Sequence, residues 1–137
     1  MKPSLQPGLR HTHSFTVTEA KTVPALYPES PLFLAMPPVF ATGFMVGFLE
    51  WACVELLAPH LDEGEQTVGT HIETSHSAAT PVGMTVTAEV ELERVEGRRF
   101  WFRVSARDER DVIAEGRHER TLIDSARFRA KLAAKAG

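Results

Sequence analysis

Cysteine is nearly absent from this 137-residue sequence, which contains Cys53 alone. A single cysteine cannot form an intramolecular disulfide and cannot supply a cysteine pair to a zinc site. Positive charge is not in excess either, because 15 Lys and Arg stand against 18 Asp and Glu, for a net charge of −3; nucleic-acid binding calls for the opposite balance. Residues 1–10 hold no apolar run of signal-peptide length. These absences predict one cytoplasmic domain over residues 1–137, with a reduced thiol and without nucleic acid as a partner.

Long apolar runs are also scarce, and the one present covers residues 40–58 with Glu50 near its middle. Its length is close to that of a membrane span, but it contains a second carboxylate, Glu55, and amphipathic segments follow it. The run therefore predicts a buried helix of a globular domain with no membrane partner. An isolated ionised carboxylate is costly in such a setting, so Glu50 is expected to be paired, neutralised or functional.

Alternation of apolar and polar residues predicts strands on both sides of this helix. Residues 11–18 form a short alternating segment, and four further segments follow after residue 67, of which residues 84–92 alternate almost without interruption. Such a period places one face of an antiparallel sheet in the core, and the apolar helix is the element available to cover it. The pattern predicts an α+β hot-dog fold, in which a curved antiparallel sheet wraps around one long central helix.

Five prolines interrupt residues 24–38. Proline at this density is expected to exclude a helix or a central strand, so the segment is predicted to be irregular. It nevertheless carries Leu32, Phe33, Leu34 and Met36, which need cover. Two interpretations stay open: a lid over a pocket, or packing against the body of the domain.

Several polar side chains lie at the alternate strand positions that otherwise carry core residues, so they are expected to point to the same face of the sheet. His76 follows the parity of the apolar residues in the segment after Thr67, and His118 and Arg120 follow that of the last segment. Glu50, His76 and Arg120 are therefore predicted to point into one layer. A histidine beside a carboxylate is the smallest pair that supports general acid–base catalysis, and a structural ion pair is the alternative.

Thr42 lies where the predicted helix begins. It is either an N-cap or part of a site in which free backbone N–H groups at the helix start hold an oxyanion. The histidines of "HTH" (11–13) and "HIETSH" (71–76) match no zinc-ligand spacing, so no metal is predicted. The basic residues at 127, 129, 131 and 135 either bind an anionic substrate or form a solvated helix face.

Five motifs carry a resemblance that extends from Thr12 to Phe128: "LYPESP", "VFATGFMVGFLEWACV", "THIETSHSAATP", "VEGRR" and "HER". On these motifs the sequence resembles the fluoroacetyl-CoA thioesterase family of hot-dog-fold acyl-CoA hydrolases. The resemblance implies a catalytic Thr42, Glu50 and His76. It also implies that Gly69 lies near the substrate carbonyl and Arg120 at the substrate site. No cofactor is implied, because coenzyme A is part of the substrate.

The resemblance also implies two lid phenylalanines, of which only Phe33 is present; Met36 occupies the second position. Methionine is flexible and seals a small pocket less rigidly than an aromatic ring. Fluorine differs little in size from hydrogen, so shape alone discriminates the two poorly. Phe33 and Met36 are predicted to line the substrate pocket.

The sequence therefore predicts a hydrolase of short acyl-CoA thioesters, with fluoroacetyl-CoA as the substrate by resemblance. A hot-dog enoyl-CoA hydratase or dehydratase and a non-catalytic acyl-CoA binding module are the alternatives. Thr42 and Glu50 are eight positions apart, which on a helix is about 12 Å along the axis. Their side chains cannot meet on one straight helix, so either Thr42 lies on a loop that folds back or the site combines residues from two subunits. A hot-dog sheet also leaves an open edge strand. Both points predict a homodimer with its active sites at or beside the subunit interface.

Overall fold

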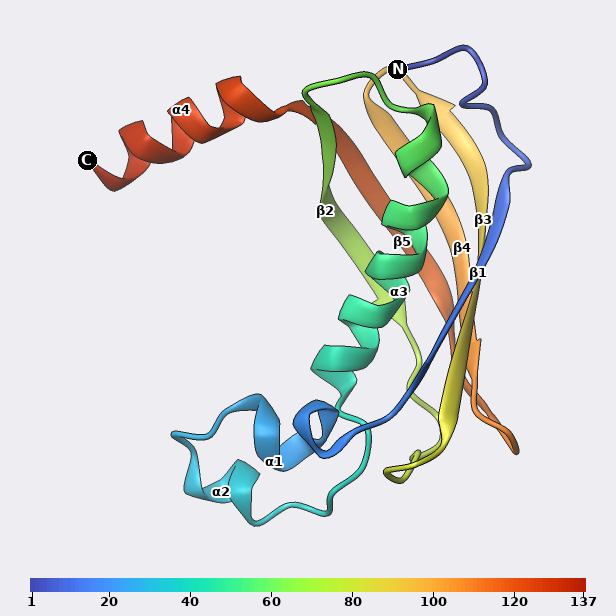
Figure 1. Ribbon diagram of the computed structural model, residues 1–137, viewed down its shortest axis with the longest axis vertical. Helices are drawn as coiled ribbons and strands as arrows, with labels where there is room; N and C mark the ends of the chain where they lie inside the picture. The colour runs from blue at the N-terminus through green and yellow to red at the C-terminus, as the bar shows by residue number, and fades with distance from the viewer.

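The computed structural model describes residues 1–137, and its main feature is a five-stranded antiparallel sheet that curls around one helix (Figure 1). The strands follow the order β1-β3-β4-β5-β2. Their bounds are β1 Arg10–Thr16, β2 Glu65–Thr74, β3 Thr85–Glu96, β4 Arg99–Arg107 and β5 Val112–Asp124. The predicted hot-dog fold is confirmed, and β1 and β2 are the edges of the sheet.

Helix α3 (Thr42–Leu57) fills the concave side of the sheet and ends in a short 3-10 turn, Ala58–His60. Its buried side chains recur every three or four residues, as in an amphipathic helix: Met45, Phe48, Leu49, Ala52, Cys53, Leu56 and Leu57. The stretch Thr42–His60 is long and apolar enough to cross a membrane by composition. Because one side of α3 packs into the sheet, it is the core helix of the domain. The opposite side exposes Trp51 and Val54.

The inward face of the sheet follows the predicted alternation in β3 and β5. Val86, Ala88, Val90 and Leu92 are all buried, and burial of each of the valine and leucine side chains contributes on the order of 1.5–3 kcal/mol. In β5, His118 and Arg120 are buried as predicted. Val112 is exposed, because the register shifts where β5 begins.

A β-bulge in β2 overturns part of the predicted parity. The register against β5 shifts between Gly69 and His71, so that Gly69 lies opposite Arg120 and Ile72 opposite His118, both on the inner face. Thr70 instead bonds the outward carboxylate of Glu119 at 2.5 Å. The alternation predicted for the segment after Thr67 is therefore wrong for the residues before the bulge, because an extra residue in one strand exchanges its inward and outward positions.

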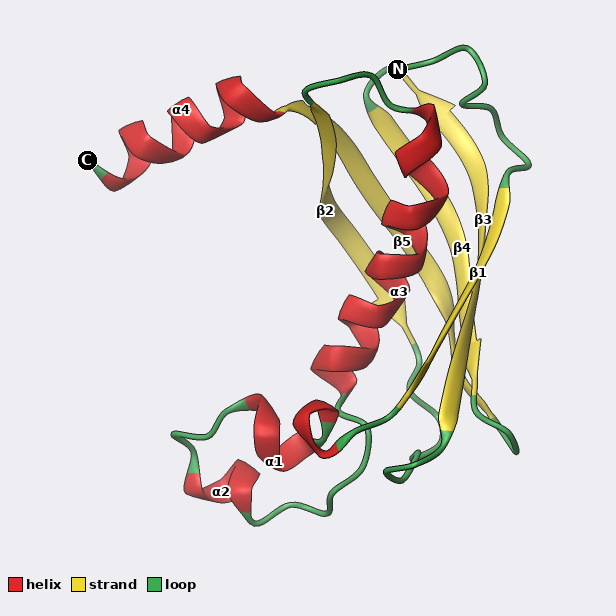
Figure 2. Cartoon of the chain, in the orientation of Figure 1, coloured by secondary structure: helices red, strands yellow, loops and turns green.

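Residues 19–38 form a proline-rich lobe at the N-terminal end of α3 (Figure 2). It contains a 3-10 turn (Glu19–Lys21) and two single-turn helices, α1 (Val23–Leu26) and α2 (Pro31–Leu34). The prediction that proline excludes a helix here is wrong, because Pro24 and Pro31 lie in first turns, where no N–H is needed. Leu32 is 78% exposed, so it does not pack against the body of the domain.

The C-terminal helix α4 (Ser125–Ala136) begins with Asp124 as its N-cap, whose carboxylate accepts a hydrogen bond from the Arg127 N–H at 3.0 Å. It extends away from the sheet and α3 and buries none of its residues (Figure 1). The predicted basic helix is confirmed, and its apolar side chains Phe128 and Leu132 are only partly covered by the chain.

Close approach of β5 to β2 explains Gly116. A Cβ atom at this position would lie 2.0 Å from the carbonyl oxygen of Glu73. We expect Gly116→Ala to lower the free energy of unfolding by about 1–3 kcal/mol, because the strands have to separate to admit a methyl group. Urea denaturation measures the change. The exposed neighbour Glu115 supplies the control: Glu115→Ala is expected to stay within about 0.5 kcal/mol of wild type, and equal values for both variants would contradict the prediction.

Candidate active site

Arg120 is the centre of a buried polar cluster between β5, β2 and α3. Its side chain is 6% exposed, and it donates through Nη1 to Glu50 Oε1 at 2.9 Å. Nε and Nη2 donate to the hydroxyl and the carbonyl of Thr67, at 2.8 and 2.9 Å. Nη1 is also 3.0 Å from His118 Nε2. The guanidinium is thus fixed by acceptors on β2, α3 and β5, and it in turn fixes the position of the Glu50 carboxylate.

Because Gly69 has no side chain, the Glu50 carboxylate can lie directly against its backbone. A Cβ atom on Gly69 would lie 2.7 Å from Glu50 Oε1 and 3.2 Å from the His118 ring. The glycine is therefore needed for close approach, and not for an unusual backbone angle. The structure brings together three of the predicted site residues here: Glu50, Gly69 and Arg120.

Thr42 and His76 form a second pair at the start of α3. Thr42 Oγ1 is 2.7 Å from His76 Nδ1. Ala41, and not Thr42, is the N-cap of the helix, so the capping interpretation of Thr42 is wrong. The Thr42 hydroxyl is directed to an imidazole because His76 lies just beyond the end of β2, where the chain continues beside β5 through the Ser75 and Ser77 N–H groups.

The environment of the His76 ring favours its neutral state. Burial lowers its pKa below the ordinary value of 6.5. Its Nε2 atom is buried and has no hydrogen-bond partner within the chain. At the same end of α3, the first backbone N–H groups of the helix lack intrahelical partners and carry the positive end of the helix dipole.

The predicted pairing of His76 with Glu50 is not formed within one chain. Glu50 bonds Arg120, whereas His76 bonds Thr42. Thr42 and Glu50 both lie on α3, eight residues or about 12 Å apart along the helix axis. The chain thus presents two separate groups of polar residues, one at the first turn of α3 and one at its middle.

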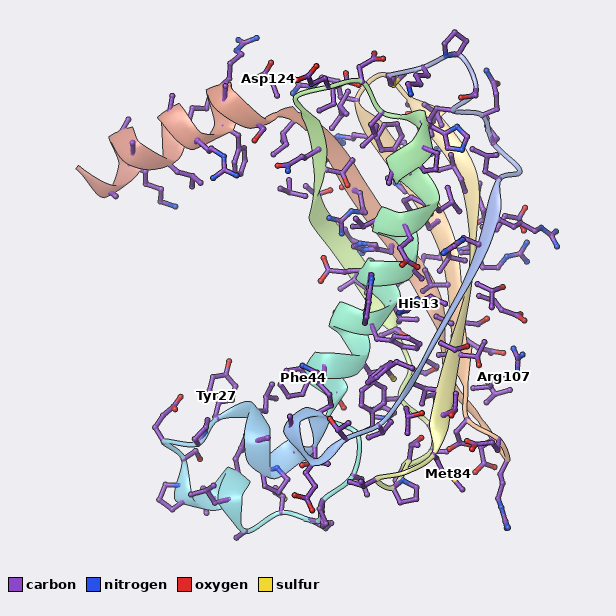
Figure 3. All side chains as sticks on the ribbon, in the orientation of Figure 1. His13, Tyr27, Phe44, Met84, Arg107 and Asp124 are labelled. Atoms are coloured by element: carbon purple, nitrogen blue, oxygen red, sulfur yellow. The ribbon has the colours of Figure 1, made fainter.

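The lid residues lie in the proline-rich lobe. Phe33 is half-buried and packs edge-on against Tyr27 with ring centroids 5.4 Å apart. Met36 is 47% exposed. Figure 3 shows Tyr27 in this lobe and Phe44 above it near the start of α3, on the same side of the helix start.

The other histidines noted in the sequence lie away from these groups. His11 and His13 on β1 contact the same Glu55 oxygen at 2.8 and 3.0 Å, and His13 packs on Trp51 with centroids 3.9 Å apart (Figure 3). His71 is exposed on the outer face of β2. The histidines of "HTH" therefore join β1 to α3.

Two residues of the Arg120 cluster were not predicted as site residues, Thr67 and His118. The sequence pattern predicted that His118 points inward, but it did not predict the contact of His118 with Arg120. Thr67 carried no signal, because threonine is common in strands whatever it contacts.

Comparison with known proteins places this geometry among thioesterases. A family described as fluoroacetyl-CoA-specific thioesterase matches residues 17–126. The fluoroacetyl-CoA thioesterase of Streptantibioticus cattleyicolor is 54% identical over 135 residues, which cover 98% of this chain and 97% of that protein. A variant of a fluoroacetyl-CoA-specific thioesterase, solved with fluoroacetate and CoA, is 55% identical with a TM-score of 0.89, over 90% of this chain and 99% of that one. A hot-dog-like protein from Thermanaerovibrio acidaminovorans shares the fold (TM-score 0.81, 24% identity, 99% of this chain and 94% of that one).

The buried histidines make stability depend on pH. His76 and His118 both have pKa values lowered by burial, so the unfolded chain binds more protons than the folded chain below about pH 6.5. The free energy of unfolding is therefore expected to fall as the pH drops from 6.5 to 5. His76→Gln removes one of these groups, and its decline is expected to be smaller than that of wild type. Urea denaturation at each pH measures both, and identical slopes would contradict the assignment.

Proposed function

Since the chain belongs to the fluoroacetyl-CoA-specific thioesterase family, we propose that its reaction is the hydrolysis of fluoroacetyl-CoA to fluoroacetate and coenzyme A. It is a hydrolase that acts on acyl-CoA thioesters. The observation that carries the assignment of a site is the Thr42–His76 hydrogen bond at the first turn of α3. There a hydroxyl, a neutral imidazole and free backbone N–H groups meet, and these are the groups that thioester hydrolysis uses.

In the proposed mechanism His76 removes a proton and Thr42 orients the reacting group. The N–H groups at the helix start, or that of Gly69, receive the charge that develops on the thioester oxygen. The lowered pKa of His76 supports the role of a base, because it keeps the ring neutral at pH 7.

Glu50 contributes a carboxylate oxygen. Its Oε1 is held by Arg120, whereas Oε2 makes no hydrogen bond within the chain. Direct attack on the thioester carbonyl and activation of water both use such a free carboxylate oxygen. Arg120 and Gly69 thus belong to the substrate site through their position around Glu50.

We propose that the working enzyme is a homodimer, in which the Thr42–His76 pair of one subunit faces Glu50 of the other. The separation of these groups along α3 supports this arrangement. The outer side of α3 also exposes Trp51 (48%) beside Val54, and β2 is an unpaired edge. A cavity of about 650 Å³ between α3, β2 and α4 has a mixed lining, whose apolar side chains Val54, Phe128 and Leu132 a second copy would cover.

We place the substrate's acyl group beneath the lobe, with Phe33 and Met36 as lid residues. The exposure of Met36 supports a lid that closes only on substrate or on a partner subunit. No cofactor takes part in this proposal, because coenzyme A enters as the leaving group. A cytoplasmic location is proposed as well, and the free, buried thiol of Cys53 supports it.

Release of free thiol from a panel of acyl-CoAs tests the activity, because only a hydrolase liberates coenzyme A. Glu50→Gln is expected to keep the fold and to lose at least about 100-fold in kcat. The amide still accepts from Arg120 but can neither attack nor accept a proton. Glu55→Gln, five residues further along α3, is the matched control and should stay near wild type. Normal turnover in Glu50→Gln would leave Glu50 a structural role only, and hydration of enoyl-CoA or binding without turnover would identify the alternative functions.

Mixing two inactive variants tests the dimer. Thr42→Ala and Glu50→Gln, unfolded together and refolded at equal amounts, are expected to recover about a quarter of wild-type activity, because half of the dimers contain one intact site. Each variant refolded alone gives the baseline, and size-exclusion chromatography with light scattering gives the mass. A mixture that dimerises but stays inactive would place both residues in one site of one subunit, and a fully active monomer would exclude the dimer.

Substitution in the lid tests selectivity. Met36→Phe is expected to change the ratio of kcat/KM for fluoroacetyl-CoA to that for acetyl-CoA by at least about threefold, because a rigid ring excludes water better than a thioether. Leu32→Phe, in the same lobe but more exposed, is the control for added surface. An unchanged ratio in Met36→Phe would mean that the lobe does not control selectivity.

A further inference from the structure

His118 is a buried titratable residue to which the proposed reaction gives no role. It is 2% exposed and lies on β5 with its ring against Phe102 of β4, at a centroid distance of 6.3 Å. Its two ring nitrogens face different partners. Nδ1 is 2.8 Å from the backbone carbonyl of His71, and Nε2 is 3.0 Å from Arg120 Nη1.

These partners determine the tautomer. A carbonyl oxygen can only accept, so Nδ1 must carry the proton. A guanidinium can only donate, so Nε2 must present its lone pair. The two contacts are satisfied together only by a neutral imidazole protonated at Nδ1.

Charged groups of both signs surround the ring: Arg120 favours its neutral state, whereas Glu50 and Glu119 oppose it. Arg120 faces it from β5 and Glu50 faces it from α3, with Glu50 Oε1 4.0 Å from Nε2. The Glu119 carboxylate lies on the outer face of the sheet, where it bonds Thr70. The His71 carbonyl on β2 accepts from the His118 ring, and the Phe102 ring on β4 stacks against it. Burial lowers the pKa of His118, and Arg120 adds to the effect. A protonated ring would direct Nε2–H at the Nη1 hydrogens and break the contact.

The contact with Arg120 bears on Glu50. Thr67 holds the Nε and Nη2 side of the guanidinium, and Nη1 is left to divide its two hydrogens between Glu50 and His118. Without an acceptor at the His118 position, one buried Nη1 hydrogen would have no partner, and the guanidinium would move to find one. Glu50 would move with it, because its Oε1 bonds the same nitrogen.

We propose that His118 is a positioning residue: its Nε2 lone pair holds Arg120 Nη1 in the orientation that presents the Glu50 carboxylate to the substrate. The proposal rests on the proposed function of Glu50. His118 itself touches neither substrate nor the reacting atoms. It connects the bulge of β2, through the His71 carbonyl, to the carboxylate on α3.

Two amide substitutions separate positioning from structure. Asparagine reaches the place of Nδ1, so His118→Asn can still donate to the His71 carbonyl but leaves one of the two Arg120 Nη1 hydrogens without an acceptor. Glutamine reaches the place of Nε2, so His118→Gln can accept from Arg120 but leaves the His71 carbonyl unpaired. A merely structural histidine would make the two variants similar in activity, whereas positioning makes them differ.

We expect His118→Asn to lose at least tenfold in kcat with KM within about threefold of wild type. His118→Gln is expected to keep kcat within about threefold of wild type. Circular dichroism and light scattering establish that both variants fold and assemble as wild type does. Wild-type kcat in folded His118→Asn, or equal losses in both folded variants, would overturn the proposal.

The tautomer of His118 can be measured in the wild-type protein, so this second test does not depend on whether a variant folds. Long-range ¹H–¹⁵N spectra of wild type labelled in histidine are expected to show His118 neutral at pH 7, with the proton on Nδ1. A proton on Nε2 would overturn the proposal. These outcomes are distinct from failure of the proposed function, which would appear as no release of coenzyme A by wild type or as full activity of Glu50→Gln.

Discussion

A guanidinium buried in the core needs an acceptor for its N–H groups, and at Arg120 this requirement organises the centre of the molecule. The charge lies on an inner face of the sheet, where an unpaired ion would cost several kcal/mol. Thr67, Glu50 and His118 come from three elements to satisfy it. The same bonds that remove the cost of burial also fix the carboxylate on α3, so stability and the placement of Glu50 depend on one side chain.

The bulge in β2 makes this arrangement possible. By adding one residue at Gly69–His71, it places a glycine opposite Arg120 and leaves the space for the Glu50 carboxylate. It also turns the His71 carbonyl toward the ring of His118. A regular strand would put a side chain into this space or remove the carbonyl from it, since bulges re-aim both the backbone and the side chains around them.

Helix α3 carries both groups of polar residues and also keeps them apart. Its first turn bears the Thr42–His76 pair, and its middle bears Glu50. A straight helix cannot bring these positions together, however the side chains turn. Its outer face is exposed, β2 is an open edge and α4 projects from the domain, and the proposed homodimer would cover these surfaces. The fold thus relates the chemistry of the chain to its assembly.

The sequence alone determined the hot-dog architecture, the buried helix with Glu50, and the inward direction of His118 and Arg120. These follow from periodicity, which depends on local geometry and on the burial of apolar surface. The resemblance supplied Gly69, which no pattern marks. Only the tertiary structure decided that Thr42 bonds His76 instead of capping the helix, and that Glu50 bonds Arg120 instead of His76. It also decided that prolines start two short helices in the lobe, and that Thr67 and His118 complete the Arg120 cluster. The physical reason is that a hydrogen bond between distant residues depends on register, and one bulge, invisible to alternation, changes which side chains meet.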